Sequence, residues 1–406
     1  MANAYITPTI IAQEMMMQLD NNLVAAKLVN RDYEEEFSKI GDTVQIRRPV
    51  KYTVRTGATF SGVDTEEGNI SLQLNSQRGV DLQGFSSKDM TLTIDKFSER
   101  YIKPAAIQLA NAIDVDVLNL GLYAGNWVGT PGTGITTIPG YFRAMQRLDE
   151  NGVPTDSRVT VLNPSDYWGM AGNLTSTYID PTARDALTKG KLPMLGNTDA
   201  YMSQNAPSFT TGARGGTPLI NGASQNVTYA TAKSTWAQTL ITDGWSNSIT
   251  GCVKAGDVFT IAGVFDVNPT SRATLTRLKQ FTITADANSS AGGAITLAIT
   301  PPIISSGPQQ NVSAAPADNA AITMSGSAST VYPFSLAFHK NAFALAVRPL
   351  DIPMGAPPGS KRITGDGISI RMIPIYDGTN DVSSIRFDVL YGVKAIFPEL
   401  ACRISG

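Results

Sequence analysis

A long stretch of the chain, residues 217–333, has the sequence pattern of β-strands alone, and it separates two regions in which helix and strand patterns alternate. Short runs rich in β-branched and aromatic residues are divided there by clusters of Gly, Asn, Ser and Asp, a spacing typical of a β-barrel or β-sandwich. The predicted strands are 227–231, 258–262, 281–284 and 295–299. We therefore predict an all-β module inserted into a mixed α/β domain, which requires both ends of the insert to lie close together.

The N-terminal part of the chain predicts a helix followed by a hairpin. Residues 7–29 have the spacing of an amphipathic helix, with Thr7 as a cap and Pro8 in the first turn. Its apolar stripe consists of Ile11, Met15, Leu19, Leu23 and Ala26. Residues 43–84 alternate apolar and polar residues around a turn-rich tip at 57–68, which indicates a long β-hairpin. Such a hairpin has few residues for a core of its own, so we expect it to pack on another structure, often a neighbouring subunit.

The strongest helix pattern covers residues 104–124, with Pro104 at its start and Gly125 just past its end. Apolar residues recur at helical spacing along it, namely Ala106, Leu109, Ala110, Ile113, Val117, Leu120 and Ala124. A helix of this length measures about 30 Å, which is long enough to act as the spine of a domain.

The regions on both sides of the β module are predicted to be mixed. Before it, we expect helices at 139–152, 163–170 and 180–190 and a strand at 158–162, with Asn163 or Ser165 as a cap. The first of these helices would begin at Pro139, carry Phe142, Met145 and Leu148, and end at Gly152. After the β module, strands are expected at 342–347, 368–375 and 385–391.

The chain has few of the residues on which catalysis depends. It contains one histidine and two cysteines in 406 residues, and 16% of its residues are charged. His339 has no partner pattern and is expected to be structural or on the surface, and the glycine-rich run 129–134 lacks the Lys-Ser/Thr ending of a phosphate loop. Asp114 and Asp116 lie two residues apart on a helix and point to different faces. We predict no enzyme, no cofactor and no metal site.

Charge and cysteine usage narrow the class of protein further. The net charge of -2 gives no basic excess for nucleic-acid binding. Cys252 and Cys402 have no metal-like spacing; a disulfide stays open, but buried thiols in a reducing compartment are favoured. The first residues lack the features of a signal peptide, and no run approaches about eighteen apolar residues, so neither secretion nor a membrane span is expected.

The order of these parts resembles the major capsid protein of tailed double-stranded DNA phages, in the fold shared by the Hong Kong phage and the herpesviruses. The local sequence is similar to coat proteins of the short-tailed Salmonella phage (P-twenty-two) type. The similarity rests on QLANAIDVDVLN (108–119), NPSDY (163–167), KLPML (191–195), KAGDVFTIAGV (254–264) and LYGVKA (390–395).

The resemblance implies an α+β fold of the Hong Kong phage type with an inserted β-barrel. Its parts would be an N-terminal helical arm (1–42), an E-loop hairpin (43–84), a P-domain with the spine helix (85–125), an A-domain (126–216), the inserted barrel (217–335), a second part of the A-domain (336–378) and C-terminal P-domain strands (379–406).

The resemblance also implies a structural protein of the virion, assembled in the bacterial host cytoplasm. Copies of the chain would form the hexamers and pentamers of an icosahedral head and contact the enclosed double-stranded DNA non-specifically. A scaffolding protein and the portal are expected partners, a decoration protein is a further candidate, and no membrane partner is expected. In relatives, acidic residues of the N-terminal arm meet a basic domain of the scaffolding protein, and Glu14 and Asp20 are the candidate counterparts.

Two other functions stay open. A β-rich tail or surface-layer protein with an adhesive role would form tubes or sheets in place of closed shells. A carbohydrate-acting enzyme would need a cleft with two converging carboxylates, for which the sequence offers no candidate pair.

Overall fold

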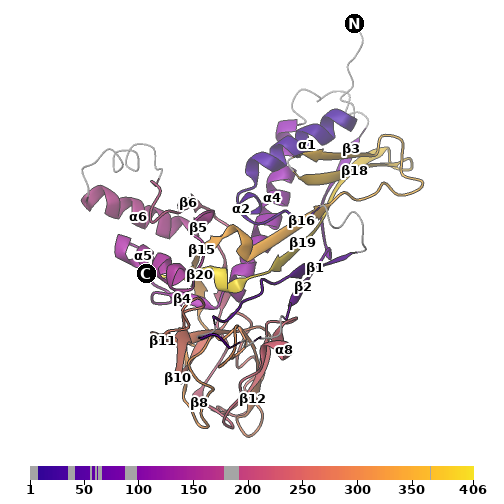
Figure 1. Ribbon diagram of the computed structural model, residues 1–406. Coiled ribbons are helices and arrows are strands. Elements are labelled where there is room, and N and C mark those ends of the chain that lie inside the picture. The colour runs from indigo at the N-terminus through magenta and orange to yellow at the C-terminus, as the bar shows by residue number, and fades with distance from the viewer. Residues whose placement is uncertain are drawn as a thin grey trace. The chain divides into compact units, whose positions relative to one another are not determined.

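The computed structural model describes residues 8–34, 42–54, 57–59, 62, 66–86, 98–177, 192–365 and 367–406. Thr7, part of the tip 57–68 and the helix predicted at 180–190 lie outside these residues. The chain divides into two units, which Figure 1 shows as one ribbon. The first unit comprises Met1–Val44, Ser71–Leu118 and Phe343–Lys394, and the second comprises Gln45–Ile70, Asn119–Ala342 and Ala395–Gly406.

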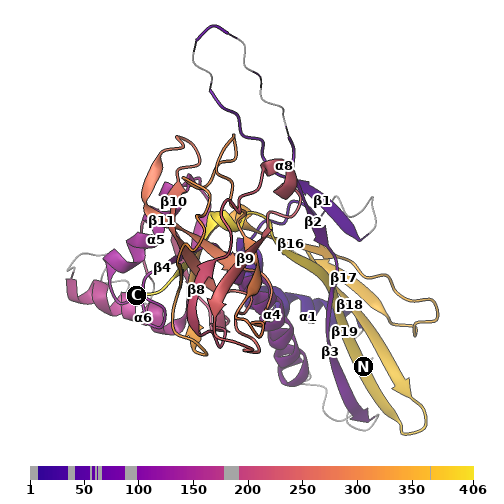
Figure 2. The same ribbon diagram turned by 90° about the horizontal axis from the view of Figure 1, so that it is seen from below.

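The first unit contains a five-stranded sheet. Its strands follow the order β16 (Phe343–Arg348), β19 (Val382–Ala395), β18 (Ile368–Asp377) and β17 (Lys361–Gly365), and β3 (Ser76–Ser86) also pairs with β19. Phe387 on β19 stands opposite Met372 on β18 and Val80 on β3, both in antiparallel register. Figure 2 shows β3, β17, β18 and β19 side by side. The strands predicted at 342–347, 368–375 and 385–391 are confirmed.

The predicted hairpin of residues 43–84 contains one strand more than expected. Strands β1 (Thr43–Arg47) and β2 (Asn69–Gln73) form a two-stranded sheet, which confirms the pairing across the tip. The following strand, β3, leaves this pair and joins β19 instead. The sequence missed this because Ser76–Ser86 contains two glycines and two charged residues, Arg78 and Asp81, which weaken the alternation of apolar and polar positions.

The helices described in the first unit come from two segments of the chain, and a short π-helix (Ser98–Ile102) precedes the second of them. The helix predicted at 7–29 is divided into α1 (Pro8–Asn22) and α2 (Ala25–Leu28), and its whole apolar stripe is buried. The predicted spine helix is present as α4 (Lys103–Leu118), continued by a 3-10 helix (Asn119–Tyr123).

The stretch Arg100–Tyr123 is long and apolar enough to cross a membrane by length and composition. However, 56% of its apolar window is buried inside the protein, as in a core helix.

The second unit contains a five-stranded mixed sheet with the order β4 (Asn126–Val128), β20 (Ala401–Ile404), β15 (Ser335–His339), β5 (Arg158–Leu162) and β6 (Asp199–Met202). Strand β15 runs antiparallel to both β20 and β5, whereas β4 is parallel to β20 and β6 is parallel to β5. The helices α5 (Ile138–Glu150) and α6 (Pro164–Thr177) contribute to the same apolar core.

The caps and buried faces of these helices largely follow the predictions. The Thr137 hydroxyl accepts from Gly140 N–H at the start of α5, and the Asn163 side chain accepts from Asp166 N–H at 2.7 Å at the start of α6. Asn163 is therefore the cap, and not Ser165. Of the three apolar residues expected on this helix, Met145 and Leu148 are buried, whereas Phe142 is 42% exposed and the neighbouring Tyr141 is buried.

The predicted β module forms a six-stranded sheet around its own core. The strands follow the order β13 (Ile322–Met324), β10 (Val258–Val267), β11 (Thr274–Ile283), β12 (Ile295–Thr300), β9 (Gln238–Trp245) and β8 (Gly216–Ile220). An antiparallel bridge between Leu219 and Ala321 connects the two outer strands, so the sheet closes into a barrel. Strands β7 (Ser208–Thr210) and β14 (Val331–Pro333) pair with each other, which brings the two ends of the insert together as predicted.

One predicted strand of the module is wrong. Residues 227–231 contribute to a single helical turn, α8 (Tyr229–Ala232), and not to a strand. A run of five residues is too short to separate a strand from one turn of helix by its pattern. The predicted strands at 258–262 and 295–299 fall within β10 and β12. The strand predicted at 281–284 overlaps the end of β11, which stops at Ile283.

The resemblance predicts that residues 336–378 belong to the A-domain and residues 379–406 to the P-domain. The pairing of strands groups these residues differently. Strands β16, β17 and β18 share a sheet with β19, whereas β20 lies beside β15 and β4. Sheet pairing decides such boundaries, and it is formed between segments that are distant in sequence. The domain names implied by the resemblance remain predictions.

Candidate functional site

The residues with catalytic or redox chemistry are buried and separated from one another. No group of three or more His, Cys, Asp or Glu side chains that could hold a metal ion occurs among the described residues. His339 is buried, its Nδ1 atom accepts from Asn341 N–H at 3.2 Å, and burial lowers its pKa. Cys252 and Cys402 are free, buried thiols, as the sequence favoured. His339, Cys252 and Cys402 are therefore part of the packed interior of the fold.

The glycine-rich run 129–134 is filled by its own chain. Gly129 has a φ of +89°, and a Cβ atom built there would lie 2.0 Å from the carbonyl oxygen of Ser405. Thr130 N–H donates to the Gly406 carbonyl at 2.7 Å, and Gly406 N–H donates to the Thr133 carbonyl at 2.6 Å. The loop therefore holds residues 405–406, and its backbone N–H groups form no open phosphate cradle.

Asp114 and Asp116 of α4 serve two different contacts, which confirms that they form no carboxylate pair. Asp114 is buried, and its two oxygens accept from the N–H groups of Val24 and Ala26 at 2.9 and 3.1 Å. It thereby caps α2. Asp116 accepts from Arg78 at 2.9 Å and from the Tyr391 hydroxyl.

The predicted scaffold-binding residues lie on α1 and are not adjacent. Glu14 accepts from Gln18 at 3.0 Å, and Asp20 forms an ion pair with Lys27 at 2.7 Å. The two acidic residues are about 120° apart around the helix axis. They flank an exposed stripe that consists of Gln13, Met17 and Asn21. A partner that covered this stripe would meet one carboxylate on each side.

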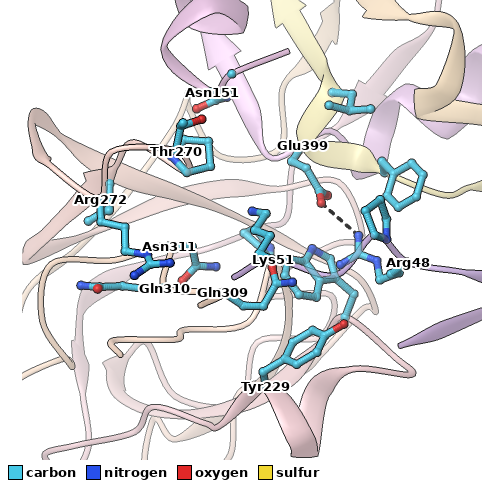
Figure 3. A pocket seen from close by; sticks show the side chains of 18 of the residues that line it. Arg48, Lys51, Asn151, Tyr229, Thr270, Arg272, Gln309, Gln310, Asn311 and Glu399 are labelled. Carbon is cyan, nitrogen blue, oxygen red and sulfur yellow. Dashed lines mark hydrogen bonds and ion pairs between the residues drawn. The ribbon is translucent and has the colours of Figure 1, made fainter. Parts of the chain in front are cut away.

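A cavity of about 580 Å³ lies within the second unit. It is lined by five segments that are distant in sequence: the residues after β1 at 48–52, the turn after α5 at 151–154, the inserted barrel, residues 339–341 at the end of β15, and residues 397–400. Four cationic side chains and one carboxylate lie along its walls, namely Arg48, Lys51, Arg272, Lys279 and Glu399. In the view of Figure 3, Lys51 stands between Arg48 and Arg272. The sequence did not suggest this cavity.

Arg48 is the most firmly held of the cavity's cations. Its guanidinium stacks on the Trp236 ring at 3.7 Å from the ring centroid and forms an ion pair with Glu399 at 3.0 Å. The Arg48 side chain is 5% exposed. Such stacking fixes the plane of a guanidinium in a way that a lysine could not reproduce.

A second buried arginine, which the sequence analysis also missed, lies on β20. Arg403 donates to the carbonyl oxygens of Gly121 at 3.1 Å, Gly256 at 2.7 Å and Leu122. Three aromatic rings surround the guanidinium at 5.3 to 5.5 Å from their centroids, those of Trp127, Phe209 and Phe334. Burial lowers the pKa of Arg403 to about 9, so it stays protonated at neutral pH. Its only signal in the sequence is one arginine within the apolar run 401–404.

Comparisons with known proteins give a consistent family. The model of the family described as "P22 coat protein - gene protein 5" matches residues 1–406. The major capsid protein of Acyrthosiphon pisum secondary endosymbiont phage 1 is 23% identical over 428 residues, covering 98% of this chain and 97% of that protein. Among solved structures, that of Mycobacterium phage Che8 matches with a TM-score of 0.50 and 14% identity over 94% of this chain and 90% of that chain. The capsid structure of cyanophage P-SCSP1u matches with a TM-score of 0.45 and 11% identity over 90% of this chain and 84% of that chain.

The family match covers the whole chain, so the resemblance found in the sequence is confirmed. The fold is α+β, of the Hong Kong phage type, and the match to the Mycobacterium phage Che8 structure agrees with it. The family is a structural one and favours a shell over the tail or surface-layer alternative. The chain therefore belongs to the P22 coat protein family and is a structural major capsid protein of a phage.

Proposed function

We propose that copies of this chain assemble, together with a scaffolding protein and around a portal, into the hexamers and pentamers of an icosahedral head. The head would enclose double-stranded DNA, which the chain would contact non-specifically and only weakly, since its net charge of -2 provides no basic excess for the phosphates. Assembly would take place in the host cytoplasm, and a decoration protein could bind the finished shell. Closed symmetry multiplies weak contacts between subunits, so no single interface needs to be strong.

The observation that carries the proposal is an exposed apolar edge on the segment that follows β1. Tyr52 is 68% exposed and Val54 is 99% exposed. Both side chains belong to the short segment that follows β1, and they are two residues apart in the sequence. A neighbouring copy packed on this segment would bury them, which is the role that the predicted hairpin arm would have.

The test is co-expression of the chain with the scaffolding protein of its own phage, followed by sedimentation and negative-stain electron microscopy. We expect closed shells tens of nanometres across, as an order of magnitude for closed multi-subunit assemblies. Val54→Asp should reduce the yield of shells, whereas Val54→Thr, which keeps the shape without a charge, should assemble. Soluble monomers or small oligomers from the unaltered chain would contradict the proposal.

We further propose that Glu14 and Asp20 contact a basic region of the scaffolding protein. Glu14→Gln and Asp20→Asn should weaken capture of the scaffolding protein by the purified subunit, and added salt should weaken capture by the unaltered chain in the same way. Lys27→Met is the matched control, because it breaks the ion pair of Asp20 and leaves the carboxylate in place. Equal capture by all of these variants would remove the two residues from the scaffold contact.

A further inference from the structure

The charges around the cavity of the second unit do not balance. Arg48 is paired with Glu399 at 3.0 Å, and Lys279 is paired with Asp266 at 2.9 Å. Among the described residues, Lys51 and Arg272 form no ion pair with a carboxylate. Arg272 donates through Nη2 to the Tyr52 carbonyl at 2.9 Å, which leaves its charge uncompensated. Lys51, which is an exposed residue, and Arg272, which is half-buried, therefore line the cavity without a carboxylate at ion-pair distance.

Buried donors without a partner gather around the same cavity. The Nε atoms of Arg48 and Arg272, Nε1 of Trp236 and Nε2 of His339 are buried and have no hydrogen-bond partner among the described residues. Because His339 Nδ1 accepts from Asn341 N–H, Nε2 carries the proton in the neutral ring. The Arg48 side chain is 5% exposed, Trp236 8% and His339 5%. Buried donors are normally satisfied, because a donor that is removed from water without a new partner destabilises the folded state.

The remaining surface of the cavity sets the size and character of an occupant. Its volume of about 580 Å³ is in the usual range for small-molecule sites. Prolines 49, 269 and 301 and Phe397 provide apolar wall, and Gln309 adds a carboxamide. The second oxygen of Glu399, Oε2, is buried and has no partner, so it is an acceptor for a hydroxyl group. There is room for an oxyanion together with an organic body.

We propose that this cavity binds a phosphate oxyanion, either as free phosphate or as the phosphate group of a small organic phosphate. Lys51 and Arg272 would neutralise the charge, and the N–H groups of Arg48, Trp236 and His339 would donate to its oxygens. Donors on several walls suit a tetrahedral anion better than a planar carboxylate, which is typically bound by one guanidinium face. Glu399 would accept from a protonated phosphate oxygen or from a hydroxyl of the organic body.

The electrostatics of Lys51 agree with an anion that is bound at this place. The pKa of its ammonium group is lowered, first because the surrounding protein desolvates it and then because Arg48, Lys279 and Arg272 repel it. Glu399 offsets only part of this effect. A bound dianion would replace repulsion with attraction. The site does not depend on shell assembly, because all of its lining residues belong to one unit of one chain.

The experiment is a titration of the full-length chain, as soluble subunits and as shells, with inorganic phosphate and separately with adenosine monophosphate. Calorimetry and thermal unfolding are measured at constant ionic strength, with chloride and sulfate as comparison anions. We expect saturable binding at one site per chain and a Tm that rises with the logarithm of phosphate concentration. Lys51→Gln and Arg272→Gln should each weaken binding at least tenfold. Tighter binding of the nucleotide would assign an organic phosphate, and binding of phosphate alone would assign the free ion.

Two controls keep the result interpretable. Arg362→Gln removes the same charge from a half-exposed side chain of the first unit and should leave the affinity unchanged. Lys51→Gln removes no hydrogen bond or ion pair of the described residues, so its fold should be intact even if Arg272→Gln, which loses the bond to Tyr52, unfolds. The absence of saturable binding, equal effects of chloride or sulfate, or equal affinity in Lys51→Gln and Arg362→Gln would overturn the proposal. So would a Lys51→Gln variant that alters assembly without any phosphate binding by the unaltered chain, since the cavity would then receive an acidic side chain of another copy.

Discussion

Arg403 Nη1 lies 2.7 Å from the carbonyl oxygen of Gly256, so a side chain of the C-terminal strand β20 is bonded to the barrel. The same guanidinium donates to Gly121 and Leu122 in the 3-10 turn that follows α4. Three segments that are distant in sequence thus meet at one cation. Carbonyl oxygens and aromatic faces compensate its charge, with Asp257 contributing at a distance.

Replacing Arg403 should destabilise the second unit strongly. Arg403→Met would leave three buried carbonyl groups without a donor, and loss of one partner in a buried charge network costs about 3–5 kcal/mol. Arg403→Lys keeps the charge, but one ammonium group cannot donate to both the barrel and the 3-10 turn as the guanidinium does. The stability of Arg403→Lys should therefore lie between that of the unaltered chain and that of Arg403→Met. The free energy of unfolding in urea measures the effect of each substitution. Arg143→Met, an exposed change on α5, is the control and should stay within about 0.5 kcal/mol of the unaltered chain. Equal stability of Arg403→Met and Arg143→Met would show that this contact is not important.

The position of α2 depends on Asp114, and this can be tested at two carboxylates on one helix. Asp114→Asn keeps one acceptor oxygen but loses the other, so one of the N–H groups of Val24 and Ala26 loses its partner. By analogy with helix caps, the expected cost is about 0.5–2 kcal/mol. Amide hydrogen exchange should become faster across Ala25–Leu28. Asp116→Asn, two residues further on, should leave the exchange of α2 unchanged, and the same acceleration in both variants would point to a general loosening of α4.

The sequence predicts this fold best where a periodic pattern is long. The spine helix and strands β18 and β19 were all expected, because many residues in each agree on one face. Short elements such as β4 and β20 carry too few residues for a pattern, and their pairing is decided by contacts distant in sequence. The division of the N-terminal helix into α1 and α2 involves Asp114, about ninety residues later in the chain, so the local sequence pattern does not predict it.

The candidate cavity was even less accessible to sequence reasoning. Arg48, Trp236 and Glu399 meet there from three parts of the chain, and each one alone reads as an ordinary residue of its segment. Buried charges are recognised by their partners, and partners of this kind are known only once the chain has folded. The family, in contrast, was recognisable, because it depends on the order of parts along the whole chain.

The stability of the first unit should depend on pH through Asp388. This carboxyl is buried between Arg371 at 2.7 Å and Arg386 at 2.9 Å. Burial raises its pKa, but the hydrogen bonds from both arginines outweigh this, and the net pKa lies below the usual 3.8. Because the folded protein then holds its proton less tightly than the unfolded chain, the contribution is present above pH 3.8 and is lost as pH falls through the folded pKa.

The corresponding measurement is the unfolding free energy of the unaltered chain and of Asp388→Asn between pH 7 and about pH 3. The variant should be less stable by about 3–5 kcal/mol near neutrality, since it leaves Arg371 buried without its partner charge. This difference should shrink as the pH falls below 3.8. Asp351→Asn, at a side chain that is 97% exposed, should show a small difference at every pH. A constant difference for Asp388→Asn would mean that its carboxylate is not the stabilising form.

Removal of the inserted barrel should prevent correct folding or assembly, because the barrel is bonded to the rest of its unit by more than its two connections. Gln280 of β11 donates to the Trp127 carbonyl at 2.9 Å and accepts from the Trp127 N–H at 2.8 Å, so it acts as a strand partner for β4. Thr282 donates to the Ala124 carbonyl at 3.1 Å. Without the barrel, these backbone groups of Trp127 and Ala124 would lose their partners, and Arg403 would lose one of its three carbonyl acceptors.

Two deletions distinguish a necessary barrel from an appendage. Deletion of 217–335 also removes β14, whereas deletion of 217–327 with a short Gly-Ser linker retains the pairing of β14 with β7. We expect both to yield aggregates or irregular particles by electron microscopy, and Gln280→Ala, which removes only the bonds of that side chain, to lower the Tm and keep closed shells. Gln146→Ala, an exposed change on α5, is the control. Regular shells from the 217–327 deletion would show that the contacts of Gln280, Thr282 and Gly256 are dispensable, and that the barrel is not needed to form the unit that carries it.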